Sequence, residues 1–238
     1  MRDDQSAFDY LTGALTGGAR PAAVGQKFTE DGAPLACPGY TTICHVDPAS
    51  DAFRALVAAQ DTLKAGPLAS AFTFMPADSL HMTVFEGVID YSRTGDRWPG
   101  HLLLDATIAE TTEDAAARLK GHTWQQKIKV RPVDVFAGFT VGIVGSTEHE
   151  ENGLRLTRNA LRDAINLHRP DHDAYQFHIT LAYLLRWLNR DEAREVIEVS
   201  HTAAKVLLSD MPELTLGPVE LCSFETMHQF TPIMSLGD

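Results

Sequence analysis

The sequence has few cysteines, no long apolar run and no apolar leader. Its 238 residues include three cysteines, which form no Cys-x-x-Cys pair and leave one unpaired in any disulfide scheme. Such a pattern is typical of reduced, structural thiols rather than of a disulfide framework. No apolar stretch approaches the roughly 18 residues that a membrane-spanning helix needs, and the start, MRDDQSAFDY, is acidic and has no signal-peptide core. We therefore expect a cytoplasmic protein that does not act at a membrane.

Positive charge is also scarce. The chain has 20 Lys and Arg against 32 Asp and Glu, which gives a formal net charge of -12. Long nucleic acids are bound by clustered cations that neutralise their phosphates, so the composition argues against such a partner. A small anionic substrate stays possible, because a pocket can be locally positive on an acidic protein. The sequence identifies no protein partner.

The first 35 residues differ in composition from the rest. Residues 1–35 are rich in Gly, Ala, Asp and Pro, and we expect an extended or partly ordered N-terminal arm there. Residues 36–238 are expected to form one domain of two pseudo-repeats, about 36–135 and 136–226, each with the order strand-helix-strand-helix-strand. The predicted strands cover 40–46, 80–86, 125–136, 138–144, 176–185, 213–217 and 219–225, and the predicted helices cover 49–64, 111–120, 151–167 and 191–207.

Two of these predicted strands carry the same His-apolar-Thr-apolar sequence, HMTV from residue 81 and HITL from residue 178. Because side chains alternate along a strand, His81, Thr83 and Phe85 share one face of the first, and His178 and Thr180 share one face of the second. A chain with ten histidines contains about one His-x-Ser/Thr sequence by chance. The residues alone therefore leave two interpretations open: one shared active site, or two strands that each hold a core histidine.

The motif pair, nearly a hundred residues apart in a two-fold pattern, resembles the 2H phosphoesterase superfamily. That superfamily includes LigT-like 2'-5' RNA ligases and 2',3'-cyclic phosphodiesterases. The resemblance covers about residues 38–226 and leaves the N-terminal arm outside. It implies a bilobal α+β fold with pseudo-two-fold symmetry, in which two antiparallel β-sheets with outer helices enclose a central cleft. The two His-x-Thr strands would then face each other across this cleft.

The chain departs from the family pattern at two places. Many relatives continue the first motif as His-x-Thr-Leu-x-Phe-Leu-Gly, whereas this chain reads HMTVFEGV, which is one residue shorter. Some LigT-like members carry Arg five residues after the second histidine, where this chain has Tyr183. These departures indicate a divergent branch, so the resemblance does not name the substrate.

The resemblance implies a metal-independent phosphodiesterase without a cofactor, acting on a cyclic or 2'-5' phosphodiester of a small nucleotide or RNA end. Hydrolysis requires that water lose a proton and that the departing ribose oxygen gain one. His81 and His178 would serve as this acid-base pair, because imidazole exchanges protons near neutral pH. Thr83 and Thr180 would donate hydrogen bonds to the phosphoryl oxygens. Which histidine is the base stays open.

Five further residues are weaker candidates for substrate contact: Tyr40, Phe85, Arg93, Arg97 and Trp98. They lie in or near the ends of predicted strands, where the loops of a cleft gather. An arginine there could hold phosphate, and an aromatic ring could flank a base. Each also has an ordinary interpretation as a packing or surface residue.

Two other classes of function stay open. The stretches HRPDHD (168–173) and CHVD (44–47) contain residue types that bind zinc, although neither has a strong ligand signature. A metal-dependent hydrolase is therefore one alternative. The other is a nucleotide-binding or regulatory module that keeps the fold without turnover, an interpretation that the two intact motifs disfavour.

Overall fold

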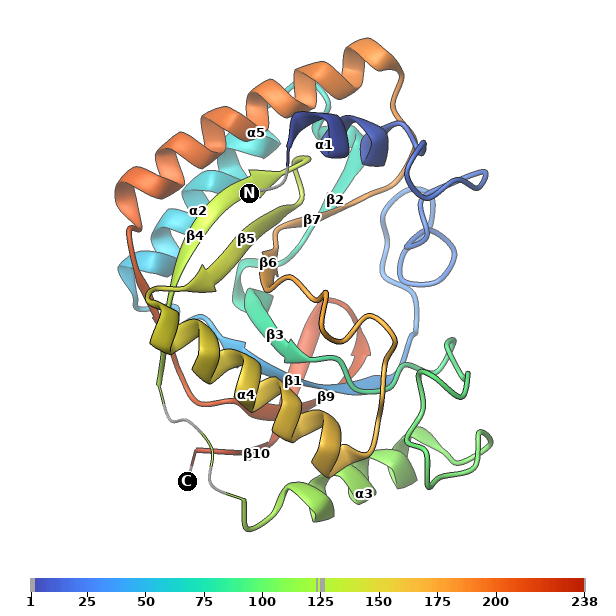
Figure 1. Ribbon diagram of the computed structural model, residues 1–238. Coiled ribbons are helices and arrows are strands. Elements are labelled where there is room, and N and C mark those ends of the chain that lie inside the picture. The colour runs from blue at the N-terminus through green and yellow to red at the C-terminus, as the bar shows by residue number, and fades with distance from the viewer. Residues whose placement is uncertain (1–2, 123, 125–126, 238) are drawn as a thin grey trace.

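A curled antiparallel sheet of eight strands dominates the computed structural model, which describes residues 3–122, 124 and 127–237 (Figure 1). The strand order is β10-β9-β1-β3-β6-β5-β4-β8, and β2 and β7 form a second, two-stranded sheet. The strands are β1 (Gly39–His45), β2 (Phe72–Phe74), β3 (His81–Phe85), β4 (Ile128–Phe136), β5 (Thr140–Gly145), β6 (His178–Thr180), β7 (Ala182–Leu184), β8 (Leu214–Leu216), β9 (Glu220–Thr226) and β10 (Gln229–Ser235).

The helices of the described residues each begin at a residue whose side chain caps the first turn. They are α1 (Asp4–Leu11), α2 (Asp51–Lys64), α3 (Ile108–Leu119), α4 (Glu148–Ile165) and α5 (Arg190–Asp210). The caps are Asp3, Ser50, Thr107, Thr147 and Asn189, and each accepts a hydrogen bond from a backbone N–H that has no partner within its helix. The four predicted helices agree closely with α2, α3, α4 and α5, whereas α1 was not predicted.

The two histidine strands are neighbours in one sheet rather than members of two facing sheets. β3 pairs antiparallel with β6 through Met82 and Ile179, at the centre of the eight-stranded order. β1 lies beside β3 and β5 lies beside β6, so the strands flanking the motifs occupy corresponding places. The expected α+β class is confirmed, but the cleft is lined by one curled sheet where two sheets were expected.

The halves of this sheet also differ from the expected pseudo-repeats. β4, which lies almost entirely within the range 36–135, pairs with β5 and β8 of the second half. β9 lies within 136–226, yet it pairs with β1 of the first half and with β10. The chain thus exchanges strands between its halves, an arrangement that a repeat of element order does not reveal. The first two residues of the predicted strand 125–136 lie outside the described residues.

The expected strand 176–185 is two short strands in different sheets. β6 belongs to the large sheet, and β7 pairs with β2 in the small one. Between them, the Leu181 N–H donates to the Phe139 carbonyl oxygen at 2.7 Å, and the Leu181 carbonyl oxygen accepts from the Met75 N–H and from Gln60 Nε2, both at 2.9 Å. These bonds satisfy the buried backbone where the chain leaves one sheet for the other.

The apolar side of the motif strands faces the main core. Met82, Val84 and Ile179 are fully buried, together with Leu56 of α2 and Leu161 of α4. α2 packs against α5, and α3 packs against α4. This alternation of core and exposed side confirms the strand faces expected from sequence. The three cysteines are buried and unbridged, as expected of structural thiols. No helix in the described parts of the chain is both long and apolar enough to cross a membrane.

The N-terminal residues are folded onto the domain instead of forming an extended arm. α1 packs on α5, and Leu11 is fully buried (Figure 1). Farther along, Val24 and Phe28 belong to a small core cluster with Cys37 and Met75. The glycines that suggested disorder form turns; Gly13, for example, has a φ of +78° and lies against the Trp187 ring, where a Cβ would come within 2.8 Å. Composition alone therefore underestimated the order of this segment.

Candidate active site

The register of β3 and β6 brings the two motifs into one patch. Because Met82 faces Ile179 in an antiparallel pair, His81 lies opposite Thr180 and Thr83 lies opposite His178. Opposed residues have Cβ atoms about 4.5–5.5 Å apart, and diagonal neighbours are about 7–8 Å apart. The two histidines are such a diagonal pair. Each imidazole therefore lies beside the threonine of the other motif.

All four motif residues line one cavity of about 300 Å³. This volume is at the lower end of the range for small-molecule sites and suits a ligand of about the size of a mononucleotide. The cavity is formed by side chains from β1, β3, β6 and β9, from the loops that follow β3 and α4, and from the N-terminal segment. It is therefore built by segments far apart in the sequence.

The two histidines are held by the same local device. Nδ1 of His81 donates to the Ser79 carbonyl oxygen at 2.7 Å, and Nδ1 of His178 donates to the Gln176 carbonyl oxygen at 2.8 Å. A carbonyl oxygen only accepts, so the proton of each neutral ring is on Nδ1 and the lone pair is on Nε2. Both rings thus present the same nitrogen for proton exchange.

The surroundings of the two rings differ. The Phe230 ring of β10 lies 4.2 Å from the His81 ring, and the Tyr175 ring lies 5.8 Å from the His178 ring. Burial lowers the pKa of His81 to about 4, and the nearby charges of His45, His178 and Lys27 act in the same direction. His81 is therefore neutral at pH 7.

A third histidine lies next to His81 on β1. His45 faces His81 across the strand pair, with the ring centroids 6.4 Å apart. Its Nδ1 lies 2.6 Å from a carboxylate oxygen of Glu220. Together with Cys222, these two residues place potential ligand atoms within 4.8 Å of one another. His45 and Glu220 are already hydrogen-bonded to each other within this cluster.

The cavity is locally positive in an acidic protein. Among the described residues that line it, three side chains are cationic, Lys27, Arg97 and Arg169, and one is a carboxylate, Glu86. Lys27 comes from the N-terminal segment, and its ammonium lies 5.1 Å from the centroid of the Tyr183 ring. Glu86 accepts a hydrogen bond from the buried Arg158 at 3.0 Å. The lining thus favours an anionic ligand.

The structure brings six of the sequence-predicted residues to this cavity: His81, Thr83, His178, Thr180, Tyr40 and Arg97. Tyr40 forms part of the wall, but its side chain is almost fully buried, and its hydroxyl oxygen has no hydrogen-bond partner among the described residues.

Three other predicted contacts are not at the cavity, which corrects the expectation for them. Phe85 is fully buried, and its ring packs against His172 and the Arg158 guanidinium. Trp98 is 1% exposed and donates from Nε1 to the Leu103 carbonyl oxygen. Arg93 lies over the Trp98 ring and donates to backbone carbonyls of the same loop. All three residues stabilise the fold next to the site.

Sequence reasoning missed two cationic residues of the cavity, Lys27 and Arg169. Lys27 stands in a segment interpreted as an arm outside the domain. Arg169 belongs to HRPDHD, which the sequence analysis singled out only for its zinc-binding residue types. In the structure, His172 of that stretch is buried, with Nε2 2.7 Å from Asn159 Oδ1, and the stretch forms no cluster of metal ligands among the described residues. Arg169 lies between His168 and Pro170, and no feature of this sequence indicated that its side chain would reach the cavity.

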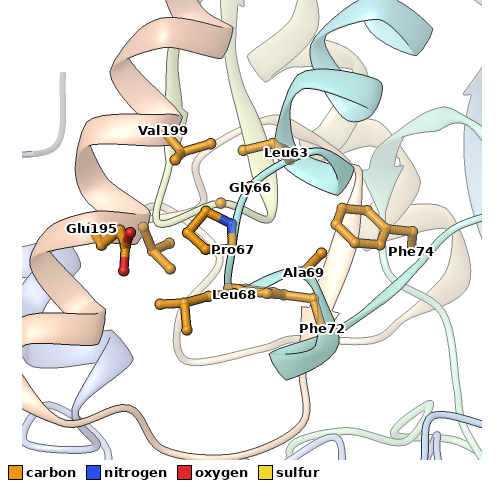
Figure 2. A pocket seen from close by; sticks show the side chains of 11 residues that line it. Leu63, Gly66, Pro67, Leu68, Ala69, Phe72, Phe74, Glu195 and Val199 are labelled. Atoms are coloured by element: carbon orange, nitrogen blue, oxygen red, sulfur yellow. The ribbon is translucent and has the colours of Figure 1, made fainter.

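A second, smaller pocket lies between α2, α5 and the turn before β2 (Figure 2). Its lining is almost entirely apolar, with Leu63, Pro67, Phe72 and Val199 around a volume of about 20 Å³. No histidine or arginine of the described residues lines it. This pocket is too small and too apolar for the chemistry of a phosphodiester.

Two comparisons with known proteins found similar proteins. Residues 27–139 match the family model 2H-phosphodiest, which is described as a domain of unknown function (DUF1868). The crystal structure of the conserved protein of unknown function ATU0111 from Agrobacterium tumefaciens is similar, with 29% sequence identity and a TM-score of 0.90 over 96% of this chain and 98% of that chain. No protein with a curated description matches significantly.

The matched part of the chain is thus similar to a family of the 2H phosphodiesterase type. It begins at Lys27, so it includes the cavity-lining part of the N-terminal segment as well as the first His-x-Thr motif. The match suggests an activity of the phosphodiesterase type, that is, a hydrolase of phosphodiester bonds.

Proposed function

We propose that this protein is a metal-independent phosphodiesterase that hydrolyses a cyclic or 2'-5' phosphodiester of a nucleotide or RNA end by acid-base catalysis. The observation that carries the proposal is the cross-strand arrangement in which His81 faces Thr180 and His178 faces Thr83. It sets two imidazoles and two hydroxyls on one side of the adjacent strands, where they line the same cavity.

The different surroundings of the histidines support one assignment of roles in this mechanism, with His81 as the base and His178 as the acid. His81, kept neutral by burial, accepts a proton from water at Nε2. The resulting hydroxide attacks phosphorus, the bond to the departing ribose oxygen breaks, and protonated His178 gives its Nε2 proton to that oxygen. The products are a phosphate monoester and a free hydroxyl. Proton exchange with solvent then restores both rings.

The remaining cavity residues act on the charge of the phosphoryl group. Thr83 and Thr180 donate hydroxyl hydrogen bonds to its oxygens, which gain negative charge in the transition state. Lys27 of the N-terminal segment supplies a cation, and its ammonium lies over the Tyr183 ring. Some LigT-like relatives carry an arginine at the position of Tyr183, and Lys27 provides a comparable charge from another part of the chain.

The test is turnover of nucleoside 2',3'-cyclic phosphates and 2'-5' dinucleotides after exhaustive chelation. We expect hydrolysis by the wild type and its loss in His81→Ala and His178→Ala, both with unchanged melting temperatures. Full activity of either variant contradicts the proposal. Tight nucleotide binding without hydrolysis would favour the regulatory module, and activity that returns only with added Zn²⁺ would favour a metal-dependent hydrolase.

A further inference from the structure

We propose that the part of the cavity lined by Arg169 and Arg97 is a second anion site, and that the substrate carries a second phosphate. This inference deepens the proposed function, on which it rests, because it names the substrate class of the same site. The substrate is then a mononucleotide-sized molecule that bears the scissile phosphodiester and a separate phosphate group.

Arg169 is a buried cation with unused donors. It lines the cavity and is only 8% exposed. Nη2 donates to the Gly87 carbonyl oxygen at 2.8 Å, whereas the buried Nε–H has no partner within the described structure. A buried, unsatisfied N–H of a charged group is costly unless a ligand or water accepts its hydrogen bond. A phosphate offers several acceptor oxygens and the opposite charge.

The carboxylates near this part of the cavity are occupied by other arginines. Glu86 pairs with Arg158 at 3.0 Å, and Asp171 pairs with Arg97 at 3.7 Å. Arg169 forms no ion pair with a described carboxylate, so one guanidinium charge is left without a direct counter-ion at the cavity. The long distance and partial exposure of the Arg97 pair leave that side chain able to turn toward a bound anion.

Burial supports the same conclusion energetically. Burial lowers the pKa of Arg169, and the nearby positive charges of Arg97 and Arg158 lower it further. The carboxylates of Glu86 and Asp171 act in the opposite direction. An anion bound beside the guanidinium would offset the cost of this buried charge.

The distance between this site and the His-x-Thr motifs limits the size of the ligand. Arg169 is anchored at Gly87, four residues beyond Thr83, and four extended residues span at most about 14 Å. Two phosphates of one nucleotide fit within this span and within a cavity of about 300 Å³. We therefore assign the second phosphate to the nucleotide that carries the scissile bond.

The experiment compares the binding of matched ligands by calorimetry, which does not depend on turnover. The probes are a nucleoside 3'-monophosphate and the corresponding 3',5'-bisphosphate, each titrated into the wild type, Arg169→Met, Arg97→Met and the control Arg194→Met. Arg194 is an exposed residue of α5, and its replacement removes the same charge away from the cavity. We expect the wild type and the control to prefer the bisphosphate by about tenfold or more.

In Arg169→Met the ratio of bisphosphate affinity to monophosphate affinity should fall to about one. In Arg97→Met this ratio should fall by a smaller factor. Arg97 is partly exposed, so its variant should fold normally even if Arg169→Met is destabilised. Equal affinity of the wild type for both ligands would overturn the second site, as would an unchanged preference in both variants. A bisphosphate preference without hydrolysis of any cyclic substrate would support the second site while refuting the proposed reaction.

Discussion

The two His-x-Thr motifs have the same local geometry and different surroundings. In both, Nδ1 donates to the carbonyl oxygen two residues earlier, and the histidine faces the other motif's threonine. Around His81, however, Phe230 and His45 crowd the ring, whereas His178 lies beside Tyr175. The comparison teaches that the motif orients the imidazole, while its neighbours set how buried and how basic that imidazole is.

The largest expected effect separates the roles of the two histidines. On a cyclic nucleotide, both His81→Ala and His178→Ala should lower kcat about 10³-fold or more. In a 4-nitrophenyl phosphodiester of the same nucleoside, the leaving group needs no proton. On this substrate the kcat of His178→Ala should therefore be within about tenfold of the wild-type kcat. His81→Ala should stay impaired on both substrates. If the 4-nitrophenyl substrate restored the kcat of His81→Ala and not that of His178→Ala, the assignment of acid and base would be reversed.

The second prediction concerns pH and stability. Because the pKa of His81 falls to about 4 on folding, the unfolded chain binds a proton between about pH 6.5 and 4 that the folded chain does not bind. Stability from this group is therefore present above pH 6.5 and decreases as the pH falls toward 4, by up to about 3 kcal/mol. Denaturant unfolding of the wild type should show a steeper loss over this window than His81→Gln. Identical slopes would contradict the lowered pKa.

A third, smaller effect tests whether the N-terminal segment contributes to catalysis through Lys27. Lys27→Met should lower kcat about tenfold, because it removes a cation from the charged phosphoryl transition state. Arg20→Met is the matched control, since Arg20 belongs to the same segment and pairs with the exposed Glu30. Equal effects of the two variants on kcat would indicate that Lys27 acts only through the fold of the segment.

The smallest effect concerns the residue two positions after Thr83. Phe85 packs in the core, so Phe85→Leu should lower the free energy of unfolding by about 1 kcal/mol and leave KM unchanged. Thermal unfolding and steady-state kinetics of the same preparation measure both quantities. An increase in KM without a loss of stability would return Phe85 to the list of substrate contacts.

Prediction from sequence was most successful where short-range signals act. The apolar pattern predicted four of the α-helices close to their observed positions, and the alternation of HMTV predicted which side of the motif faces the core. Prediction failed at Phe85 and Trp98, because alternation and position in a loop do not reveal what covers a side chain. It also failed at 176–185, where the backbone bonds of Leu181 divide one apolar run between two sheets.

The sequence by itself determined the two His-x-Thr faces, the α+β class and the resemblance to the 2H phosphoesterase superfamily, since these depend on residues close together along the chain. The tertiary structure alone decided that β3 and β6 are adjacent, with each histidine opposite the other motif's threonine. It also decided that Lys27 and Arg169 reach the same cavity. Strand pairing and charge placement of this kind arise from contacts between distant segments, and their free energy comes from burial and pairing that no local pattern encodes.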